Sequence, residues 1–364
     1  MMKTYFTTPS DQIAKNSWGQ ILQELTTDTN STFGIKQSTP NQNTEMKNEE
    51  PFNVSHQNQK YDIHNFLKNH PGGLNYVRPY KDKDITKRMK DTLHSKAAYY
   101  LLREYKEDGR DLTSTSDSSD LENLVDWDKP MLSQVAALGN KYSEWVVLPV
   151  DRKLRLFDNP ILESLTITPW YVVPIVWIPI ITYFIYMGFN KYVEITKDES
   201  PSVPSLIRIV GGVVLWTLLE YSLHRWIFHM KVSGNSKILI YIHFAIHGLH
   251  HKVPFDPRRL VFPPLPAALI AYALYCLVAV ILPEEGRLLI LAGGLTGYVI
   301  YDMIHFYLHY GAPKENSYLY HLKRYHNHHH FEHHDNGYGI SSVLWDKIFG
   351  TTITLRKLQF GIKW

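Results

Sequence analysis

Ten histidines in four spaced motifs are the residues of this sequence best suited to do chemistry. An H-x4-H pair precedes one H-x-x-H-H motif and an H-x3-H pair precedes a second, so the pattern recurs in two halves. The ten are His224, His229, His247, His250, His251, His305, His309, His326, His329 and His330. Of the 19 histidines in the chain, 15 lie between His224 and His334. This density at regular spacing predicts a site for two metal ions.

Helical spacing would bring these rings together. Residues three and four apart share a helix face, so each H-x-x-H-H motif and the H-x3-H pair can aim two or three ring nitrogens at one point. The H-x4-H pair is separated by about 140° on an α-helix, so it needs a bent helix end or two different metals. Imidazole suits iron, zinc, copper and nickel, and ten nitrogens exceed the four ligands of a structural zinc site. An incidental histidine-rich tract would have no reason to keep this spacing.

Four apolar segments predict membrane-spanning helices, because each is long enough to cross a hydrocarbon core of about 30 Å. The segments are residues 170–189, 205–223, 263–282 and 288–308. The first and third are free of charged residues, whereas the second holds Arg208 and Glu220 and the fourth holds Asp302 and His305. For the second and fourth segments, buried or re-entrant helices are the alternative.

The distribution of Lys and Arg predicts the orientation of these helices. Residues 224–260 hold six of them and the chain after His305 holds seven, whereas the opposite loops hold only Lys191, Lys197 and Arg287. Cytosolic loops carry the excess of positive charge. Both termini and all four histidine motifs are therefore expected on the cytosolic side, with the substrate reached from the bilayer.

Composition excludes several other classes of protein. The net charge of +3 is small, and no basic run with interleaved aromatic residues indicates a nucleic-acid partner. The single cysteine, Cys276, lies in the third apolar segment and excludes a disulfide framework and a Cys-ligated cluster. No secretory signal is expected, because the N-terminal region is polar.

The N-terminal third is predicted to contain a separate unit. Residues 61–73 favour a short strand, a helical turn and a sharp turn at His70, and His94 opens a helical stretch at 95–105. His56 and His64 are expected at the surface. Residues 1–50 are predicted to be irregular or disordered, 51–110 to form this unit and 111–130 to form a linker. The remainder, 131–364, begins with an amphipathic stretch at 131–145 that is expected to lie on the membrane surface.

The N-terminal unit resembles the cytochrome b5 family. His70, Pro71, Gly72 and Gly73 look like the haem signature of that family, and His94 follows at the spacing of its second axial ligand. Two imidazoles on opposite faces of a haem saturate the iron, which then carries electrons and does not bind oxygen. The strand, acidic helix and strand that usually precede the signature have no clear counterpart in residues 1–60.

Residues 61–355 as a whole resemble the fatty acid 2-hydroxylases of the membrane fatty acid hydroxylase and sterol desaturase superfamily. Besides the histidine motifs, the resemblance rests on V-D-W at 125–127, R-R-L-V-F-P-P at 258–264 and G-Y-G-I-S at 337–341. It implies a mainly α fold: a small α+β cytochrome b5-like haem domain, then a bundle of four transmembrane helices with a cytosolic, histidine-rich catalytic cap.

The same resemblance implies an activity and its cofactors. The ten histidines would be catalytic and would hold two metal ions, iron being expected and zinc the alternative, while His70 and His94 would bind haem b. The enzyme would use O2 to hydroxylate carbon 2 of long-chain fatty acyl groups for 2-hydroxy sphingolipid (ceramide) synthesis. Electrons would come from NAD(P)H through cytochrome b5 reductase to the haem. The expected location is the endoplasmic reticulum membrane, as a multi-pass protein among membrane lipid.

Other functions stay open at this point. Sterol or sphingoid-base oxidases share the histidine motifs, and front-end desaturases share the haem domain. His329, Glu332 and His333 fit the H-x-x-E-H pattern of a zinc peptidase, and a membrane metal transporter is a further candidate. Asp302 either supports a histidine ligand or makes a helix-packing hydrogen bond. The surplus histidines are expected to support the ligands or lie at the surface: His243, His321, His328, His333 and His334.

Overall fold

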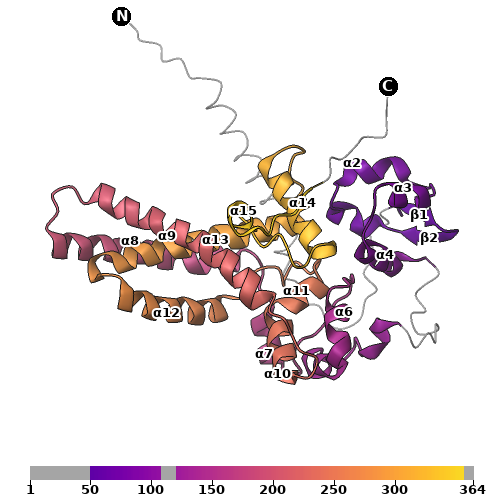
Figure 1. The fold of residues 1–364 in the computed structure, drawn as a ribbon, viewed down its shortest axis with the longest axis horizontal. Helices are drawn as coiled ribbons and strands as arrows, with labels where there is room; N and C mark the ends of the chain where they lie inside the picture. The colour runs from indigo at the N-terminus through magenta and orange to yellow at the C-terminus, as the bar shows by residue number, and fades with distance from the viewer. Residues whose placement is uncertain (1–49, 108–119, 356–364) are drawn as a thin grey trace, which may run out of the picture. The chain divides into compact units, whose positions relative to one another are not determined.

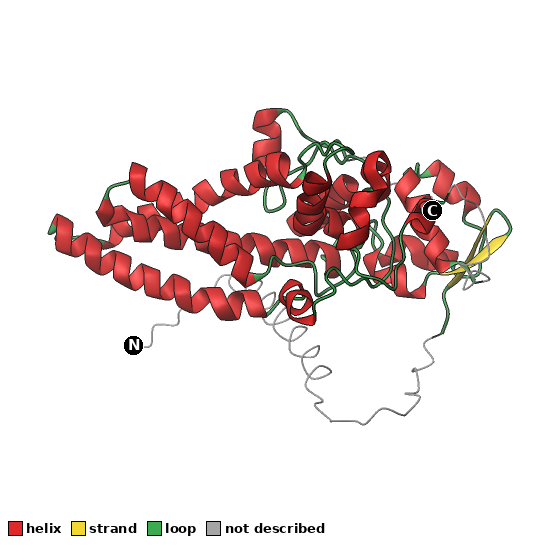
Figure 2. Ribbon diagram, turned by 90° about the horizontal axis from the view of Figure 1, so that it is seen from below, coloured by secondary structure: helices red, strands yellow, loops and turns green. Residues whose placement is uncertain are grey.

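The chain is mainly helical, with a single two-stranded sheet among the residues that the structure describes (Figure 2). The structure, a computed structural model, describes residues 50–107 and 120–355. All of these lie in one compact unit, Glu50–Trp364. The predictions for residues 1–49, and for residues 111–119 of the expected linker, lie outside the described residues. The domain boundaries therefore remain predictions.

The first described segment folds around its own small core. Strand β1 (Asn53–His56) pairs antiparallel with β2 (Gln59–Asp62). Six short helical elements follow: η1 (His64–Asn69), α2 (Leu74–Val77), η2 (Arg78–Tyr80), α3 (Thr86–Asp91), α4 (Lys96–Leu102) and η3 (Arg103–Tyr105). Their core includes Val54, Met89 and Leu102. The predicted strand, helical turn and helix are present, but the expectation for His56 is wrong, because its ring is buried against Tyr61 and Tyr99.

Residues 120–166 form short helices rather than one long amphipathic helix. They are η4 (Leu121–Leu124), α5 (Leu132–Val135), η5 (Ala136–Lys141), α6 (Tyr142–Val146) and α7 (Pro160–Thr166). The chain breaks at Gly139, whose φ of 51° is readily adopted only by glycine. Met131, Tyr142 and Trp145 are buried in a core that also contains Ile240. The prediction of a single helix at 131–145 on the membrane surface is therefore wrong, because its apolar side packs inside the protein.

Four long apolar helices confirm the four predicted spans. They are α8 (Val172–Thr196), α9 (Ser202–Ser222), α12 (Pro264–Ile281) and α13 (Glu284–Tyr310), and each is long and apolar enough to cross a membrane. They run side by side in Figure 1. Helix α13 is the most buried of the four and packs against both α8 and α9. Cys276 is exposed on α12.

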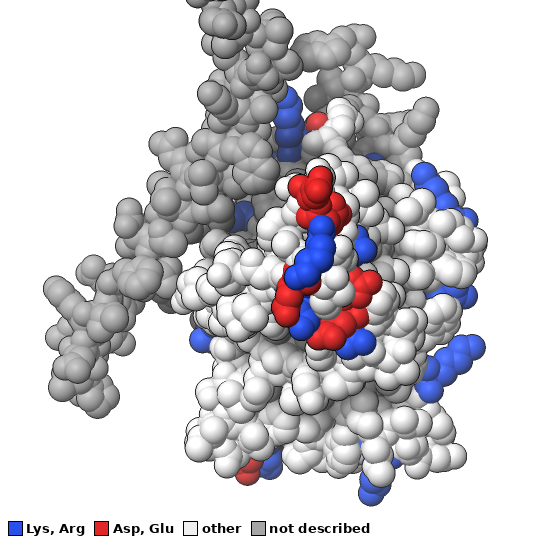
Figure 3. All heavy atoms as spheres, turned by 90° about the vertical axis from the view of Figure 1, so that its left-hand side faces the viewer, with Lys and Arg blue, Asp and Glu red and all other residues white. Residues whose placement is uncertain are grey.

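The end of this bundle remote from the histidines is capped by charged side chains. Figure 3 shows acidic and basic groups gathered there, surrounded by uncharged surface. Lys191 near the end of α8 pairs with Glu284 at the start of α13 (3.3 Å) and with Glu194 (3.9 Å). Polar groups at a helix end beside a long apolar flank are typical of a membrane span.

The other end of the bundle carries the remaining helices. Helix α9 continues into η6 (Leu223–Phe228), a π-helical turn. After it come α10 (Lys237–His243), a second π-helical turn η7 (Phe244–Gly248) and α11 (Leu249–Lys252). Helices α14 (Tyr318–Phe331) and α15 (Leu344–Phe349) follow α13. Every histidine motif lies on these elements or on the adjoining end of α13.

Two glycines set the close approach of α9 and α13. A Cβ atom at Gly212 would lie 2.2 Å from the Ile290 carbonyl oxygen, and one at Gly293 would lie 2.0 Å from the Ile209 carbonyl oxygen. Small residues let membrane helices approach until their backbones touch. The contact holds α13 in register with α9, and the two helices carry four of the ten histidines in or just after their last turns.

We predict that Gly293→Ala destabilises the protein by about 1–3 kcal/mol, because the added methyl group forces α9 and α13 apart. The measurement is the thermal midpoint of the detergent-solubilised chain. Gly294→Ala is the matched control, since its Cβ would meet nothing closer than the Gly212 carbonyl oxygen at 3.9 Å. Equal midpoints for the two variants would contradict this account of the contact.

Candidate metal centre

The ten histidines of the four motifs converge in two clusters at one end of the bundle. The first cluster comprises His250, His305, His309, His326 and His330, each with one ring nitrogen within 4.8 Å of the others. The second comprises His224, His229, His247 and His329 by the same distance. His251 joins the second cluster, because its Nε2 lies 3.0 Å from that of His247 and 3.2 Å from that of His229. The structure thus brings all ten predicted residues together.

Each H-x-x-H-H motif serves both clusters. His247 and His251, four residues apart, face the second cluster, whereas His250 between them faces the first. In α14 the pair four apart, His326 and His330, faces the first cluster, and the middle residue faces the second. Of the two or three rings that the spacing could aim at one point, two in each motif share a cluster, whereas the middle histidine faces the other cluster. The two clusters are interleaved, because the neighbouring residues His250 and His251 belong to different clusters, and so do His329 and His330.

The H-x4-H pair converges because its helix changes pitch. In η6 the His229 amide donates to the His224 carbonyl at 3.0 Å, a hydrogen bond across five residues. A π-helical turn of this kind places residues five apart on the same face, and such turns are frequent at functional sites. Of the two predicted solutions, the distorted helix end is the one found, and both rings face one cluster.

Backbone carbonyls orient several of the rings. The Nδ1 atoms lie 2.6 Å from the Tyr338 oxygen for His224, 3.1 Å from the Leu260 oxygen for His305 and 2.7 Å from the Asn336 oxygen for His329. A carbonyl only accepts, so in each ring Nδ1 carries the proton and Nε2 presents a lone pair. This is the tautomer of a histidine that binds a metal through Nε2.

The spacing of the Nε2 atoms fits a bound cation. Neighbouring Nε2 atoms lie 2.8 to 3.2 Å apart in both clusters. Lone pairs at this distance repel one another unless a positive charge lies among them. Nitrogens bound at about 2.1 Å and at right angles to one another around an ion are roughly 3 Å apart. The donor set therefore fits two metal ions.

Burial keeps these rings neutral. Desolvation, and then the neighbouring imidazoles, hold the pKa of His247, His250, His251, His326 and His330 well below the usual 6.5. Burial acts in the same way on the pKa of His329. Because only the neutral ring donates to a metal, the clusters are ready to bind cations at neutral pH.

His70 and His94 form a separate site whose geometry fits a haem. Their ring centres are 6.2 Å apart, and imidazoles bound at about 2 Å on opposite sides of one metal atom have centres roughly 6 Å apart. The Nδ1 atom of His94 faces the Met89 carbonyl at 3.1 Å, which leaves Nε2 free. Burial, with His94 nearby, lowers the pKa of His70 to about 3, so this ring is neutral. Gly73 turns the chain beside it with φ +89°.

The structure decides between the two predicted roles of Asp302 and excludes the zinc peptidase alternative. Asp302 accepts from the Phe262 amide (3.2 Å) and the Tyr298 hydroxyl (3.4 Å), so it makes helix-packing hydrogen bonds. The H-x-x-E-H peptidase pattern is excluded, because His333 gathers with Glu332 and His328 while His329 lies in the second cluster.

The other surplus histidines lie outside both clusters. The His243 ring contacts the Tyr142 hydroxyl at 2.6 Å. The His334 ring packs at 5.8 Å from that of His251, and His321 stacks on Tyr325. His321 and His333 are exposed and His334 packs on a cluster histidine, as expected for surface or supporting residues, whereas His243 contacts Tyr142, which is not a candidate ligand.

The most important residue that sequence reasoning missed is Glu220. Its buried carboxylate accepts from the Ile340 and Ser341 amides (2.9 and 2.8 Å) and from the Ser341 hydroxyl (2.5 Å). It thereby holds the loop whose Tyr338 carbonyl orients His224. The available signal was a carboxylate in an apolar helix, one turn before a candidate ligand.

An apolar pocket between α8, α9, α12 and α13 reaches residues that contact both clusters. It is lined by side chains that include Trp216, Phe228, Ala271 and Tyr301. Phe228 stacks on His247 (ring centres 5.1 Å apart), and Tyr301 stacks on His305 (6.0 Å). One end of the pocket is therefore walled by residues that touch both clusters, and the other extends among the membrane-spanning helices.

Comparisons with known proteins agree with this arrangement. A family model described as fatty acid hydroxylase matches residues 209–351, and one described as cytochrome b5-like heme/steroid binding domain matches residues 39–134. The fatty acid 2-hydroxylase of Rattus norvegicus is 39% identical over 330 residues, which cover 80% of this chain and 89% of that protein. A ceramide very long chain fatty acid hydroxylase of Saccharomyces cerevisiae is 33% identical over 355 residues, covering 82% and 89%.

A plant relative and a solved structure extend the comparison. A dihydroceramide fatty acyl 2-hydroxylase of Arabidopsis thaliana is 42% identical over 230 residues, covering 62% of this chain and 92% of that protein. A structure described as full-length scs7p, with only the hydroxylase domain visible, superposes with a TM-score of 0.56 at 33% identity. The superposition covers 64% of this chain and 87% of that one.

We predict that His250→Ala and His329→Ala each lower the metal content of the purified chain, because each removes a donor from a different cluster. The loss of a direct ligand should weaken binding at that cluster by at least about 10- to 100-fold, the cost typical of losing only a supporting partner. Metal content is measured by mass spectrometry after dialysis against a chelator, and the haem absorption spectrum should stay unchanged. His333→Ala is the control, since this side chain lies outside both clusters. A loss of metal from the control equal to that from the two variants would refute the assignment.

Proposed function

The chain belongs to the fatty acid 2-hydroxylase family, and we propose that it is a membrane-bound, O2-dependent oxygenase that hydroxylates carbon 2 of long-chain fatty acyl groups. The product serves 2-hydroxy sphingolipid (ceramide) synthesis. The observation that carries the proposal is the position of two clusters of neutral imidazoles at one end of an apolar pocket between membrane-spanning helices. That combination suits oxidation of an unactivated carbon on a lipid chain.

Each cluster would hold one metal ion, iron being expected and zinc the alternative. The first ion would be held by His250, His305, His309, His326 and His330, and the second by His224, His229, His247, His251 and His329. Bound there as iron, the ions would supply the redox chemistry that activates O2, which zinc cannot supply because it does not change oxidation state. The Tyr338, Leu260 and Asn336 carbonyls keep the Nε2 lone pairs aimed inward before any ion arrives.

The apolar pocket would bind the acyl chain and exclude water from the reacting carbon. Helices α9, α12 and α13 supply most of its walls. With the tail between these helices, the carboxyl end of the chain lies nearest to Phe228 and Tyr301, beside the histidines. Carbon 2 is next to the carboxyl carbon, so this orientation favours oxidation there over oxidation further along the chain.

Electron supply and location complete the proposal. Haem b between His70 and His94 would receive electrons from NAD(P)H through cytochrome b5 reductase. We propose the endoplasmic reticulum membrane as the location, with both termini in the cytosol. The structure supports a common side for the chemistry, because all ten histidines lie at the end of the bundle opposite the charged cap of Lys191 and Glu284.

We predict that the chain restores 2-hydroxy acyl sphingolipids in yeast that lacks its own 2-hydroxylase, as measured by lipid mass spectrometry. The His250→Ala variant, expressed at the same level, should restore none. Altered sterols or hydroxylated sphingoid bases without 2-hydroxy acyl chains would move the assignment to a sister oxidase. With expression and membrane insertion confirmed, an unchanged lipid profile would refute the proposed reaction.

We also predict that Ala271→Phe shifts the products towards shorter acyl chains, because the larger ring fills the pocket part-way along α12. A steric cost of about 1–3 kcal/mol for the longest chains corresponds to a loss of roughly 5- to 150-fold. Ala273→Phe is the matched control: the same substitution two residues further along the helix, at an exposed position outside the pocket lining. The length distribution of the 2-hydroxy products decides the outcome, and equal distributions for the two variants would place the chain elsewhere.

A further inference from the structure

The segment with the His70 and His94 site, residues 50–107 (here the haem unit), contacts the rest of the chain in three separate places. We propose that the haem unit is docked in one fixed orientation, with its His70 side towards the histidine clusters. Phe255 packs between the His70 site and the first cluster. The docking itself stands on contacts within the protein. Only the identities of the haem and the metal ions rest on the proposed function.

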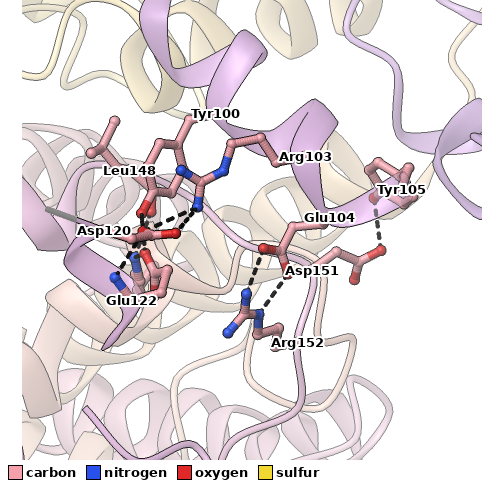
Figure 4. A network of polar contacts seen from close by, with 10 residues as sticks. Tyr100, Arg103, Glu104, Tyr105, Asp120, Glu122, Leu148, Asp151 and Arg152 are labelled. Atoms are coloured by element: carbon pink, nitrogen blue, oxygen red, sulfur yellow. Dashed lines mark hydrogen bonds and ion pairs between the residues drawn. The ribbon is translucent and has the colours of Figure 1, made fainter. Parts of the chain in front are cut away.

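The first docking contact joins the last helices of the haem unit to residues 120–152 (Figure 4). The Tyr100 hydroxyl donates to Glu122 Oε1 at 2.6 Å, and Arg103 pairs with Asp120 at 2.9 Å. Tyr100 also packs against the core that contains Trp145. The end of the haem unit therefore packs on a core other than its own.

A bidentate ion pair adds directional constraint to this contact. Arg152 donates through Nε and Nη2 to the two Glu104 oxygens at 2.6 and 2.8 Å. Only 17% and 5% of these side chains are exposed, so water competes weakly with the pair. Tyr105 donates to Asp151 at 2.7 Å beside it. Paired parallel hydrogen bonds of this kind fix orientation as well as distance.

The first contact is anchored next to the second histidine cluster. The Lys252 ammonium, fully buried, donates to Glu122 at 2.6 Å and to the Trp145 and Leu148 carbonyls at 3.1 and 2.8 Å. Lys252 directly follows His251 in α11. Glu122 therefore links the haem unit to the second cluster. It accepts from Tyr100 of the haem unit and from Lys252, the residue next to His251.

The second docking contact lies on the opposite part of the haem unit, at the turn that carries His70. The Tyr320 hydroxyl donates to the Gly72 carbonyl at 3.1 Å. Nearby, the Asn75 amide donates to Glu315 Oε1 at 3.2 Å. Tyr320 belongs to α14, the helix that carries three of the ten cluster histidines. The turn beside His70 is therefore attached to the helix that builds both clusters.

The third contact is a row of aromatic rings between the two sites. Phe66 lies 6.0 Å from the His70 ring and 5.8 Å from Phe255, measured between ring centres. Phe255 stacks on Phe331 at 6.2 Å, and Phe331 lies 6.2 Å from the His330 ring. Each ring is in contact range of the next, so packed aromatic side chains connect His70 to a histidine of the first cluster.

Contacts at three separate places restrict the orientation of a body, whereas a single contact leaves it free to rotate. In the docked arrangement one electron would leave the reduced haem iron, which is oxidised, and would reduce a metal ion of the clusters. No bond would form or break in this step, and NAD(P)H would reduce the haem again through the reductase. Phe255 is thus a positioning residue. Its ring contacts Phe66 of the haem unit and Phe331 beside His330, and so keeps the His70 site and the first cluster at a fixed separation.

Cross-linking in membranes tests the docking without any turnover. Asn75→Cys and Glu315→Cys are combined in a Cys276→Ser background of the full-length chain, which removes the one native cysteine. A short bis-maleimide should join the two positions, as quantified by peptide mass spectrometry. The control pairs Glu315→Cys with Lys87→Cys on the exposed surface of α3. A docked unit should favour the first pair at least about tenfold, because docking raises the effective concentration of only that pair.

Weakening the first docking contact should also lower the cross-link between positions 75 and 315. Tyr100→Phe combined with Glu104→Gln removes polar contacts on the opposite part of the haem unit and should reduce the Asn75–Glu315 cross-link several-fold, with the haem spectrum unchanged. Equal yields for the two cysteine pairs, or a yield insensitive to the Tyr100 and Glu104 substitutions, would overturn fixed docking. Because no substrate is used, a failure of the proposed function leaves this result unaffected.

The role of Phe255 is tested by the rate at which the reduced haem is re-oxidised when the holoenzyme meets O2 and substrate. Phe255→Leu should slow the absorbance change roughly tenfold, since small losses of positioning cost 10- to 100-fold, and Phe255→Trp should restore much of it. The haem spectrum and the rate of haem reduction by the reductase should not change. Phe157→Leu, a matched change outside the aromatic row, is the control, and an equal rate in both leucine variants would overturn the role of Phe255.

Discussion

Mutual repulsion among buried lone pairs is the constraint on which the rest of this structure depends. Ten imidazoles aim their Nε2 atoms at two points, with neighbouring nitrogens 2.8 to 3.2 Å apart. Burial keeps the rings neutral, so they cannot relieve the repulsion by sharing protons. The arrangement is unfavourable by itself and becomes favourable when cations enter. Packing elsewhere in the protein must therefore hold the rings in place.

That support comes from two π-helical turns, a buried carboxylate and a close helix–helix contact. Two π-helical turns, at Leu223–Phe228 and Phe244–Gly248, rotate histidines onto faces that an α-helix would not give them. Glu220 clamps the loop that orients His224. The close contact of Gly212 and Gly293 sets the relative height of the helices that carry His224 and His305. Each of these features lowers the stability of the fold somewhat in order to position a histidine ring, which is typical of a functional site.

The membrane and the haem unit then act on the same centre from two directions. The apolar pocket reaches the clusters from within the bundle, where Phe228 and Tyr301 stack on histidines. The haem unit reaches them from outside the bundle, through Phe255 and the Tyr320 contact. A reaction that consumes both a lipid chain and electrons needs these two approaches to be separate, and the fold keeps them apart.

The sequence by itself determined the ten histidines, the His70 and His94 pair and the four spans, because helical periodicity and long apolar runs are local properties of a chain. Tertiary structure alone decided that His250 and His329 cross to the other cluster, that Glu220 holds a loop 120 residues away, and that Lys252 joins Glu122. The stretch at 131–145 and the burial of His56 were mispredicted for the same reason. Such pairings depend on which helix faces meet after packing, and spacing along the chain carries no record of them.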